Sequence, residues 1–210
     1  MIALNINLKR ENMRTPYFLK LEAERGSLTD EELEYVATML KDFDPKECTY
    51  EFLGSMLNII RLSDRKAVLE GKMKQPRAIK YKSIIERYLY FPQKSYYSSR
   101  ALGILCQKTW NFTEEYLDTV VSFLKGVKWD FFKTCYAVSY MILGEYLLEK
   151  QQSGFTQKEE ELLKLVEEVS QNPNSPFFGI PGALGRLRGV SYEEAYPIFD
   201  LFELKIYFEP

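Results

Sequence analysis

Three groups of acidic residues have the spacing at which paired carboxylates could share a hydrolytic reaction. They are Glu31, Glu32 and Glu34; Glu114, Glu115 and Asp118; and Glu159, Glu160 and Glu161. Pairs of carboxylic acids hydrolyse glycosides when one protonates the leaving group and the other attacks or activates water. Each group, however, falls in the first turns of a predicted helix, where the helix dipole favours anions. We therefore interpret all three groups as helix starts rather than as catalytic pairs.

The 210-residue sequence contains no histidine. This excludes Ser-His and Cys-His catalysis, histidine-ligated metals and imidazole acid–base chemistry. Its three cysteines, Cys48, Cys106 and Cys135, are far apart and form no CxxC motif. We interpret them as small core residues in a reducing compartment. No cofactor and no metal are expected.

The segment 179–189 holds four glycines at mostly three-residue spacing. It matches neither a dinucleotide-binding GxGxxG motif nor a Walker loop, because no Lys-Ser/Thr follows it and no buried strand precedes it. Glycines permit tight turns and close approach of the backbone. We interpret the segment as a tight turn.

Helix-start signals divide the chain into helices. Capping-box spacing, with a side-chain oxygen three residues before a carboxylate, joins Thr29 with Glu32, Asp44 with Glu47, Thr156 with Glu159 and Ser191 with Glu194. The stretch 130–150 is apolar nearly all round, which predicts a central buried helix. Short strands are expected near the ends, at 2–8, where apolar and polar residues alternate, and at 204–208.

A repeat of about 42 residues runs through these helices. The runs at 28–31 and 112–115 align at a shift of 84, Phe112-Thr113 aligns with Phe155-Thr156 at 43, and Leu102-Gly103 aligns with Leu143-Gly144 at 41. The predicted antiparallel helix pairs span 28–62, 76–108, 112–150 and 155–202. Stacking such pairs buries a continuous core. Between the first two pairs, residues 63–75 form a charged linker or a short extra helix.

This pattern resembles the HEAT-like family of helical repeats, whose units are about 40–47 residues long. The resemblance covers residues 28–170 and rests on the apolar-Thr starts and the Leu-Gly pairs. It implies an all-α single domain over 1–210, a short solenoid of about four helix pairs with an inner binding surface. Small bacterial proteins of this type include immunity proteins of toxin systems and DNA glycosylases of the alkylpurine type.

Basic residues are concentrated in one segment, although the net charge is −2. Residues 61–100 contain eleven Lys or Arg and three acidic residues, interleaved with tyrosines. Such a surface suits an acidic protein or a phosphate backbone, and Tyr, Trp and Arg are strong interface anchors. The predicted partner-binding residues are Arg77, Lys80, Tyr81, Arg87, Tyr96, Tyr97, Arg100, Trp110 and Trp129. In the alternative interpretation, the charges form a solvated face paired with acidic helices.

The sequence predicts a non-enzymatic binding module, most concretely an immunity protein that occludes a cognate bacterial toxin. The basic segment would cover an acidic or nucleic-acid-binding surface of that toxin. The first alternative is a glycosylase that uses Trp110, Trp129 and a nearby acid, and the second is an adaptor for a regulatory protein. The slightly acidic net charge argues against general nucleic-acid binding.

A cytoplasmic location without a membrane partner is expected. The start of the chain has no positive region ahead of an apolar one, unlike a signal peptide. The longest apolar stretch, 135–148, is too short to cross a bilayer. Replacing Arg77 and Lys80 by Glu is expected to leave the melting temperature nearly unchanged and to abolish partner binding.

Overall fold

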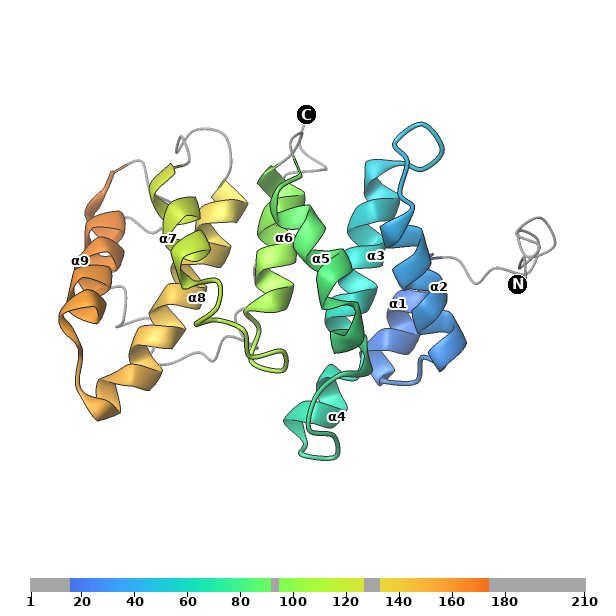
Figure 1. Ribbon diagram of the computed structural model, residues 1–210, viewed down its shortest axis with the longest axis horizontal. Helices are drawn as coiled ribbons and strands as arrows, with labels where there is room; N and C mark the ends of the chain where they lie inside the picture. Colours follow the sequence, from blue (N-terminus) through green and yellow to red (C-terminus); the bar gives the residue numbers. More distant parts are fainter. Residues whose placement is uncertain (1–15, 92–94, 127–132, 174–210) are drawn as a thin grey trace. The chain divides into compact units, whose positions relative to one another are not determined.

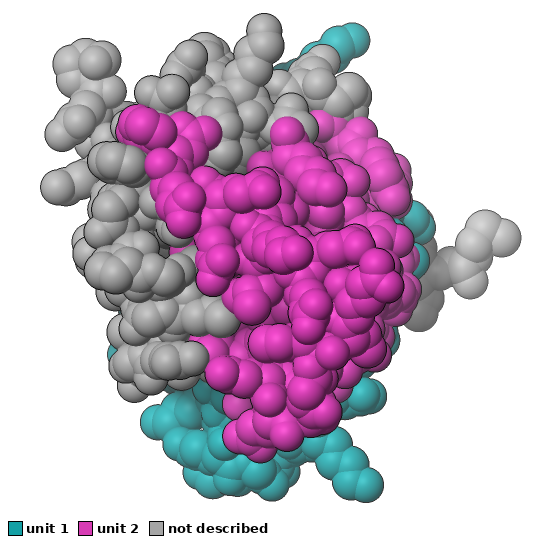
Figure 2. Space-filling view, turned by 90° about the vertical axis from the view of Figure 1, so that its left-hand side faces the viewer, with its two compact units in different colours: residues 1–84 teal, residues 85–210 magenta. Residues whose placement is uncertain are grey.

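The computed structural model describes residues 16–91, 95–126 and 133–173 (Figure 1). Regular structure within these ranges is entirely helical, which confirms the all-α prediction. The strands expected at 2–8 and 204–208 and the glycine-rich turn at 179–189 lie outside the described residues. The chain forms two compact units, residues 1–84 and 85–210, coloured separately in Figure 2. The single-domain expectation remains a prediction.

Unit 1, residues 1–84, is built around α3 (Tyr50–Leu62). This helix packs against both α1 (Pro16–Arg25) and α2 (Asp30–Lys41). Its buried side chains recur at helical spacing and form one apolar face: Leu53, Met56, Leu57, Ile59 and Ile60. Helix α1 is missing from the predicted pairs, so α3 has one more packing partner than the sequence indicated.

Short elements complete unit 1. The charged segment after α3 contains a short helix, α4 (Arg65–Leu69), and this decides between the two interpretations of 63–75. A 3-10 turn, η2 (Arg77–Tyr81), leads into α5 (Lys82–Leu89). The border between the two units runs through α5.

Unit 2, residues 85–210, is organised by α8. This helix packs against α6, α7, α9 and the 3-10 turn η3. The bounds are α6 Ser95–Leu105, α7 Leu117–Gly126, α8 Lys133–Lys150, η3 Gln151–Ser153 and α9 Gln157–Gln171. Residues 138–144 of α8 are all buried, which confirms the prediction of a central helix.

Two of the predicted capping boxes are confirmed. At α2, the Glu32 amide donates to the Thr29 hydroxyl at 3.2 Å, and the Thr29 amide donates to the Glu32 carboxylate at 2.9 Å. Thr156 and Glu159 make the same reciprocal pair at α9. The box predicted at Ser191 lies outside the described residues.

Two predicted helix starts are wrong. The Asp44 carboxylate accepts the Lys46 amide at 2.8 Å and closes a turn, so α3 begins only after the N-cap Thr49. The helix expected to begin at Glu114 and Glu115 starts only at Leu117, because Thr113 donates its hydroxyl to the Cys106 carbonyl at 3.1 Å and is followed by a turn. Both residues satisfy a local hydrogen bond that competes with helix capping.

Replacing Thr156 with alanine is expected to destabilise α9 by about 1 kcal/mol, because the Glu159 amide loses its acceptor. Hydrogen exchange of the first turn of α9 measures the effect. Thr38→Ala, at an exposed position inside α2, is the control and should cost nothing, since alanine is the better helix former. Equal protection of the first turn in wild type and Thr156→Ala would refute the role of the cap.

Candidate partner-binding surface

Arg77 joins three parts of unit 1. Its Nε and Nη2 donate to the two carboxylate oxygens of Asp64, at 2.9 and 2.8 Å, and its backbone amide donates to Asp64 at 2.9 Å. Nη1 donates to Asp30 at 2.9 Å and Nη2 to the Leu28 carbonyl at 2.7 Å. The guanidinium therefore ties the end of α3 and the start of η2 to the start of α2.

Charge and burial make this junction an internal ion pair. The Asp64 side chain is 3% exposed and that of Arg77 is 31% exposed. Burial alone would raise the pKa of Asp64, but the hydrogen bonds and charge of Arg77 outweigh burial and lower it. The pKa of Arg77 is raised, first by its hydrogen bonds to Asp64. A fork of two parallel bonds suits arginine and not lysine.

Arg77 therefore has a structural role within unit 1. The expectation that charge reversal at Arg77 spares the melting temperature does not fit this geometry, because a glutamate would face Asp64. We withdraw Arg77 from the proposed contact surface. Sequence spacing could not reveal the pairing, since Asp64 lies 13 residues away and Asp30 lies 47 residues away.

The Asp64–Arg77 pair closes the base of residues 65–76, which we call the clasped loop. The loop contains α4 and projects beyond the end of α3 (Figure 1). Helix α4 ends in a Schellman motif, in which the Gly71 amide donates to Val68 at 3.0 Å and the Lys72 amide donates to Ala67 at 2.8 Å. Gly71 has φ +72°, a conformation that glycine adopts without strain. Both the base and the turn after α4 are therefore fixed.

The clasped loop carries one exposed large apolar residue and four cationic side chains. Leu69 is 46% exposed. The basic residues are Arg65, Lys66, Lys72 and Lys74, and the acidic residue is Glu70. Lys72 pairs with Glu70 at 2.6 Å, and this hydrogen bond lowers the pKa of Glu70. The loop has a net positive charge, because it contains four cationic side chains and one carboxylate.

Lys80 and Tyr81, two other predicted contact residues, lie on η2 in unit 1. Lys80 is exposed, and its Nζ lies 5.0 Å from the centre of the Tyr81 ring, within cation–π range. Tyr81 is half-buried and donates its hydroxyl to Glu34. Burial first, and then Glu34, raise its pKa. Lys80 therefore faces solvent, whereas Tyr81 connects η2 to α2.

The predicted contact residues in unit 2 divide by burial. Tyr97 and Trp110 are 1% and 2% exposed, so neither ring is accessible to a partner. Arg87 is exposed and Arg100 is half-buried. The side chain of Tyr96 and the whole of Trp129 lie outside the described residues. A buried indole at Trp110 also gives no support to a glycosylase that would hold a base with this residue.

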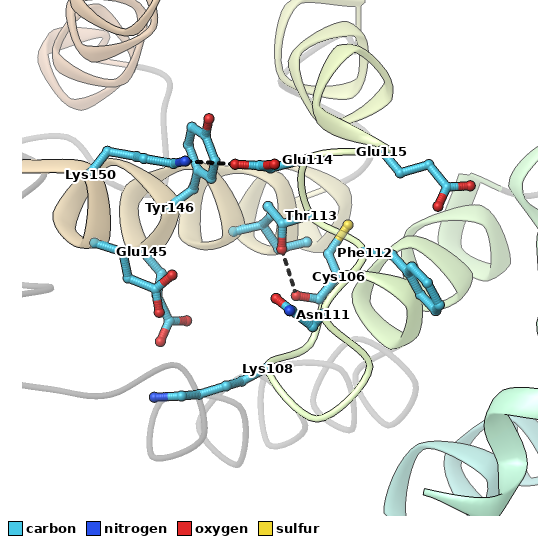
Figure 3. Close-up of a pocket in the computed structure, with 12 residues that line it drawn as sticks. Cys106, Lys108, Asn111, Phe112, Thr113, Glu114, Glu115, Glu145, Tyr146 and Lys150 are labelled. Carbon is cyan, nitrogen blue, oxygen red and sulfur yellow. Dashed lines mark hydrogen bonds and ion pairs between the residues drawn. The ribbon is translucent and has the colours of Figure 1, made fainter. Parts of the chain in front are cut away.

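Unit 2 contains a pocket of about 430 Å³ between the segment after α6 and one face of α8 (Figure 3). Acidic and basic side chains line it together: Glu114, Glu115, Glu145, Glu149, Lys108 and Lys150. Lys150 extends from α8 to Glu114, with its Nζ 2.6 Å from the carboxylate and 5.3 Å from the Tyr146 ring centre. Hydrogen bonding to Glu114 raises the pKa of Lys150. These contacts join the segment before α7 to α8 across the pocket.

Four side chains with catalytic potential have structural contacts in the described ranges. Cys106 is buried, and burial followed by the charge of Glu115 raises the pKa of its thiol to about 12. The thiol is therefore protonated at neutral pH and is a poor nucleophile. Of the acidic groups, Glu32 and Glu159 cap helices, and Asp118 pairs with Lys158 at 3.3 Å.

Comparisons with protein-family models, with curated proteins and with solved structures find no match to this chain. Within the described ranges, no group of cysteine and acidic side chains is placed to hold a metal ion. None of the helices described is both long enough and apolar enough to cross a membrane. The HEAT-like resemblance remains a prediction.

Proposed function

We propose that this protein is a non-enzymatic binding module of stacked HEAT-like helix pairs, and that it acts as an immunity protein which binds and occludes a cognate bacterial toxin. The observation that carries the proposal is the exposure of four large apolar side chains to solvent. Tyr17 is 65% exposed, Phe18 54%, Leu69 46% and Tyr90 79%. Exposed aromatic and aliphatic groups of this size are typical anchors of protein interfaces.

The packing of the helices supports the repeat interpretation. In unit 1, α3 contacts α1 as well as its neighbour α2; in unit 2, α8 contacts α6 as well as its neighbour α7. Contact with the next helix but one is expected when hairpins stack on one another. The matching Leu-Gly pairs at 102 and 143 fall on α6 and α8, two helices that pack together, and both leucines are fully buried.

The commitment of acidic, thiol and indole groups to caps, ion pairs and core also favours binding over catalysis. A toxin-neutralising protein acts by covering a surface, and for this it needs a stable scaffold and exposed anchors rather than activated groups. Exposed lysines flank the exposed Leu69 in the sequence of unit 1, which fits that requirement.

The test is capture from a lysate of the native host with tagged full-length protein, before and after nuclease treatment, read by mass spectrometry. Excess untagged protein is the control and must displace a specific partner. One stoichiometric protein that survives nuclease, is toxic when expressed alone and is tolerated on co-expression is the expected result. Absence of such a protein overturns the proposal, and recovery of nucleic acid that salt removes points to nucleic-acid binding instead.

A further inference from the structure

We propose that the clasped loop, residues 65–76, is the element by which unit 1 docks onto its partner, and that the partner presents acidic side chains around an apolar hollow that receives Leu69. This inference rests on the proposed function and names the contact and its chemistry. Three properties of the loop support the inference: its fixed shape, its positive charge, and the negative charge of the side chains at its base.

The loop is held in one conformation before any partner arrives. The Asp64–Arg77 pair fixes both of its ends, with contacts of 2.8 and 2.9 Å, and the Schellman motif fixes the turn at Gly71. A contact element that is already ordered loses little conformational entropy on binding. Compact surface loops with closed ends are frequently functional.

The exposed side chains of the loop have the composition of an interface anchor with a charged rim. None of the α4 residues is buried, and Leu69 is the large apolar one among them. The side chains of Lys66 and Lys72 are 69% and 70% exposed, and Lys74 is exposed as well. Apolar centres with polar rims are the common arrangement in protein interfaces. Complementary carboxylates on the partner would steer it and fix its register.

The base of the loop favours a protein over a nucleic acid. Arg77 contacts Asp30 at 2.9 Å, and the Asp30 side chain is 73% exposed. Glu31 and Glu34, on the same helix, are also exposed. A continuous phosphate backbone that reached the lysines of the loop would meet these carboxylates at its base. A folded protein can instead place its acidic residues opposite the loop alone.

The first step of the test is photo-crosslinking in the native host. A benzophenone amino acid is placed at Leu69 or Lys74 of the full-length chain, and at exposed Lys164 on α9 as the control. A single protein adduct at the two loop positions, absent at Lys164, is expected. An adduct at Lys164 alone, or a captured partner without an adduct at either loop position, overturns the docking loop and leaves the proposed function standing. No protein adduct at any position, together with no captured partner, overturns both.

The second step measures affinity with the crosslinked partner in purified form. The triple variant Lys66→Glu, Lys72→Glu, Lys74→Glu is expected to raise the Kd by roughly 100-fold, since like charges then face each other. The matched control, Lys41→Glu, Lys125→Glu, Lys164→Glu, alters three exposed lysines on other helices and should change the Kd by less than about threefold. Equal Kd values for the two triple variants, at unchanged melting temperatures, would overturn the docking loop.

Discussion

Arg77→Met is expected to lower the free energy of unfolding by about 3 kcal/mol, because it leaves the Asp64 carboxylate buried without its cation. Because methionine retains the apolar stem of arginine, the lost free energy of unfolding measures the contribution of the guanidinium charge and its hydrogen bonds. Urea denaturation measures the change, and hydrogen exchange of residues 28–84 locates it in unit 1. A domain is stable by only about 5–15 kcal/mol, so the effect is large.

Two variants control this result. Arg25→Met removes an arginine whose side chain is 70% exposed and pairs with Glu22 only at 3.9 Å, so it should cost less than about 0.5 kcal/mol. Adding Asp64→Asn to Arg77→Met removes the uncompensated charge and should recover part of the loss; asparagine tolerates the left-handed backbone at this position, φ 58°. Equal losses for Arg77→Met and Arg25→Met would contradict the internal ion pair.

The same pair predicts the direction of a pH effect. Because Arg77 lowers the pKa of Asp64 below its ordinary 3.8, the pair stabilises the folded state above that pH. This contribution is lost as the pH falls through the lowered pKa of the folded state. In Arg77→Met, burial is left to raise the pKa of Asp64. The stability difference between wild type and Arg77→Met should therefore be large at pH 7 and shrink as the pH falls, starting above pH 3.8, where Asp64 of the variant takes up its proton.

Leu143→Ala is expected to cost about 2–5 kcal/mol, because it opens a cavity in the centre of unit 2. Leu143 is fully buried on α8, which packs against α6, α7 and α9. Thermal and urea denaturation measure the loss. Leu148→Ala, a half-buried position on the same helix, is the matched control and should cost clearly less. Equal costs at the two positions would mean that α8 is not the packing centre of unit 2.

Local signals in the sequence predicted those helix starts that depend only on residues close together in the sequence. A capping box needs only residues three apart, and the boxes at Thr29 and Thr156 formed as expected. The same spacing at Asp44 produced a turn, because its carboxylate bonds the amide two residues on. Propensity alone does not decide between these two uses of an aspartate.

The candidate site was harder to predict because it depends on tertiary contacts. Arginine suits both interfaces and internal ion pairs. Arg77 proved internal only once Asp64 and Asp30 were placed beside it. Tyr97 lies in the basic segment and Trp110 follows it in the sequence, yet both are buried. The one signal that could have indicated the clasped loop is a lone aspartate before the short charged segment and an arginine after Pro76.

Closure of the loop at its base has an evolutionary consequence. Because the ends are joined by side chains outside residues 65–76, substitutions at exposed positions between them do not touch the contacts of α3 with α1 and α2. Doubling the length of a flexible loop costs only about 0.6 kcal/mol in closure entropy. On the proposal that this loop docks onto the partner, its exposed positions are therefore where a change of partner would be accommodated, with the Asp64–Arg77 pair left in place.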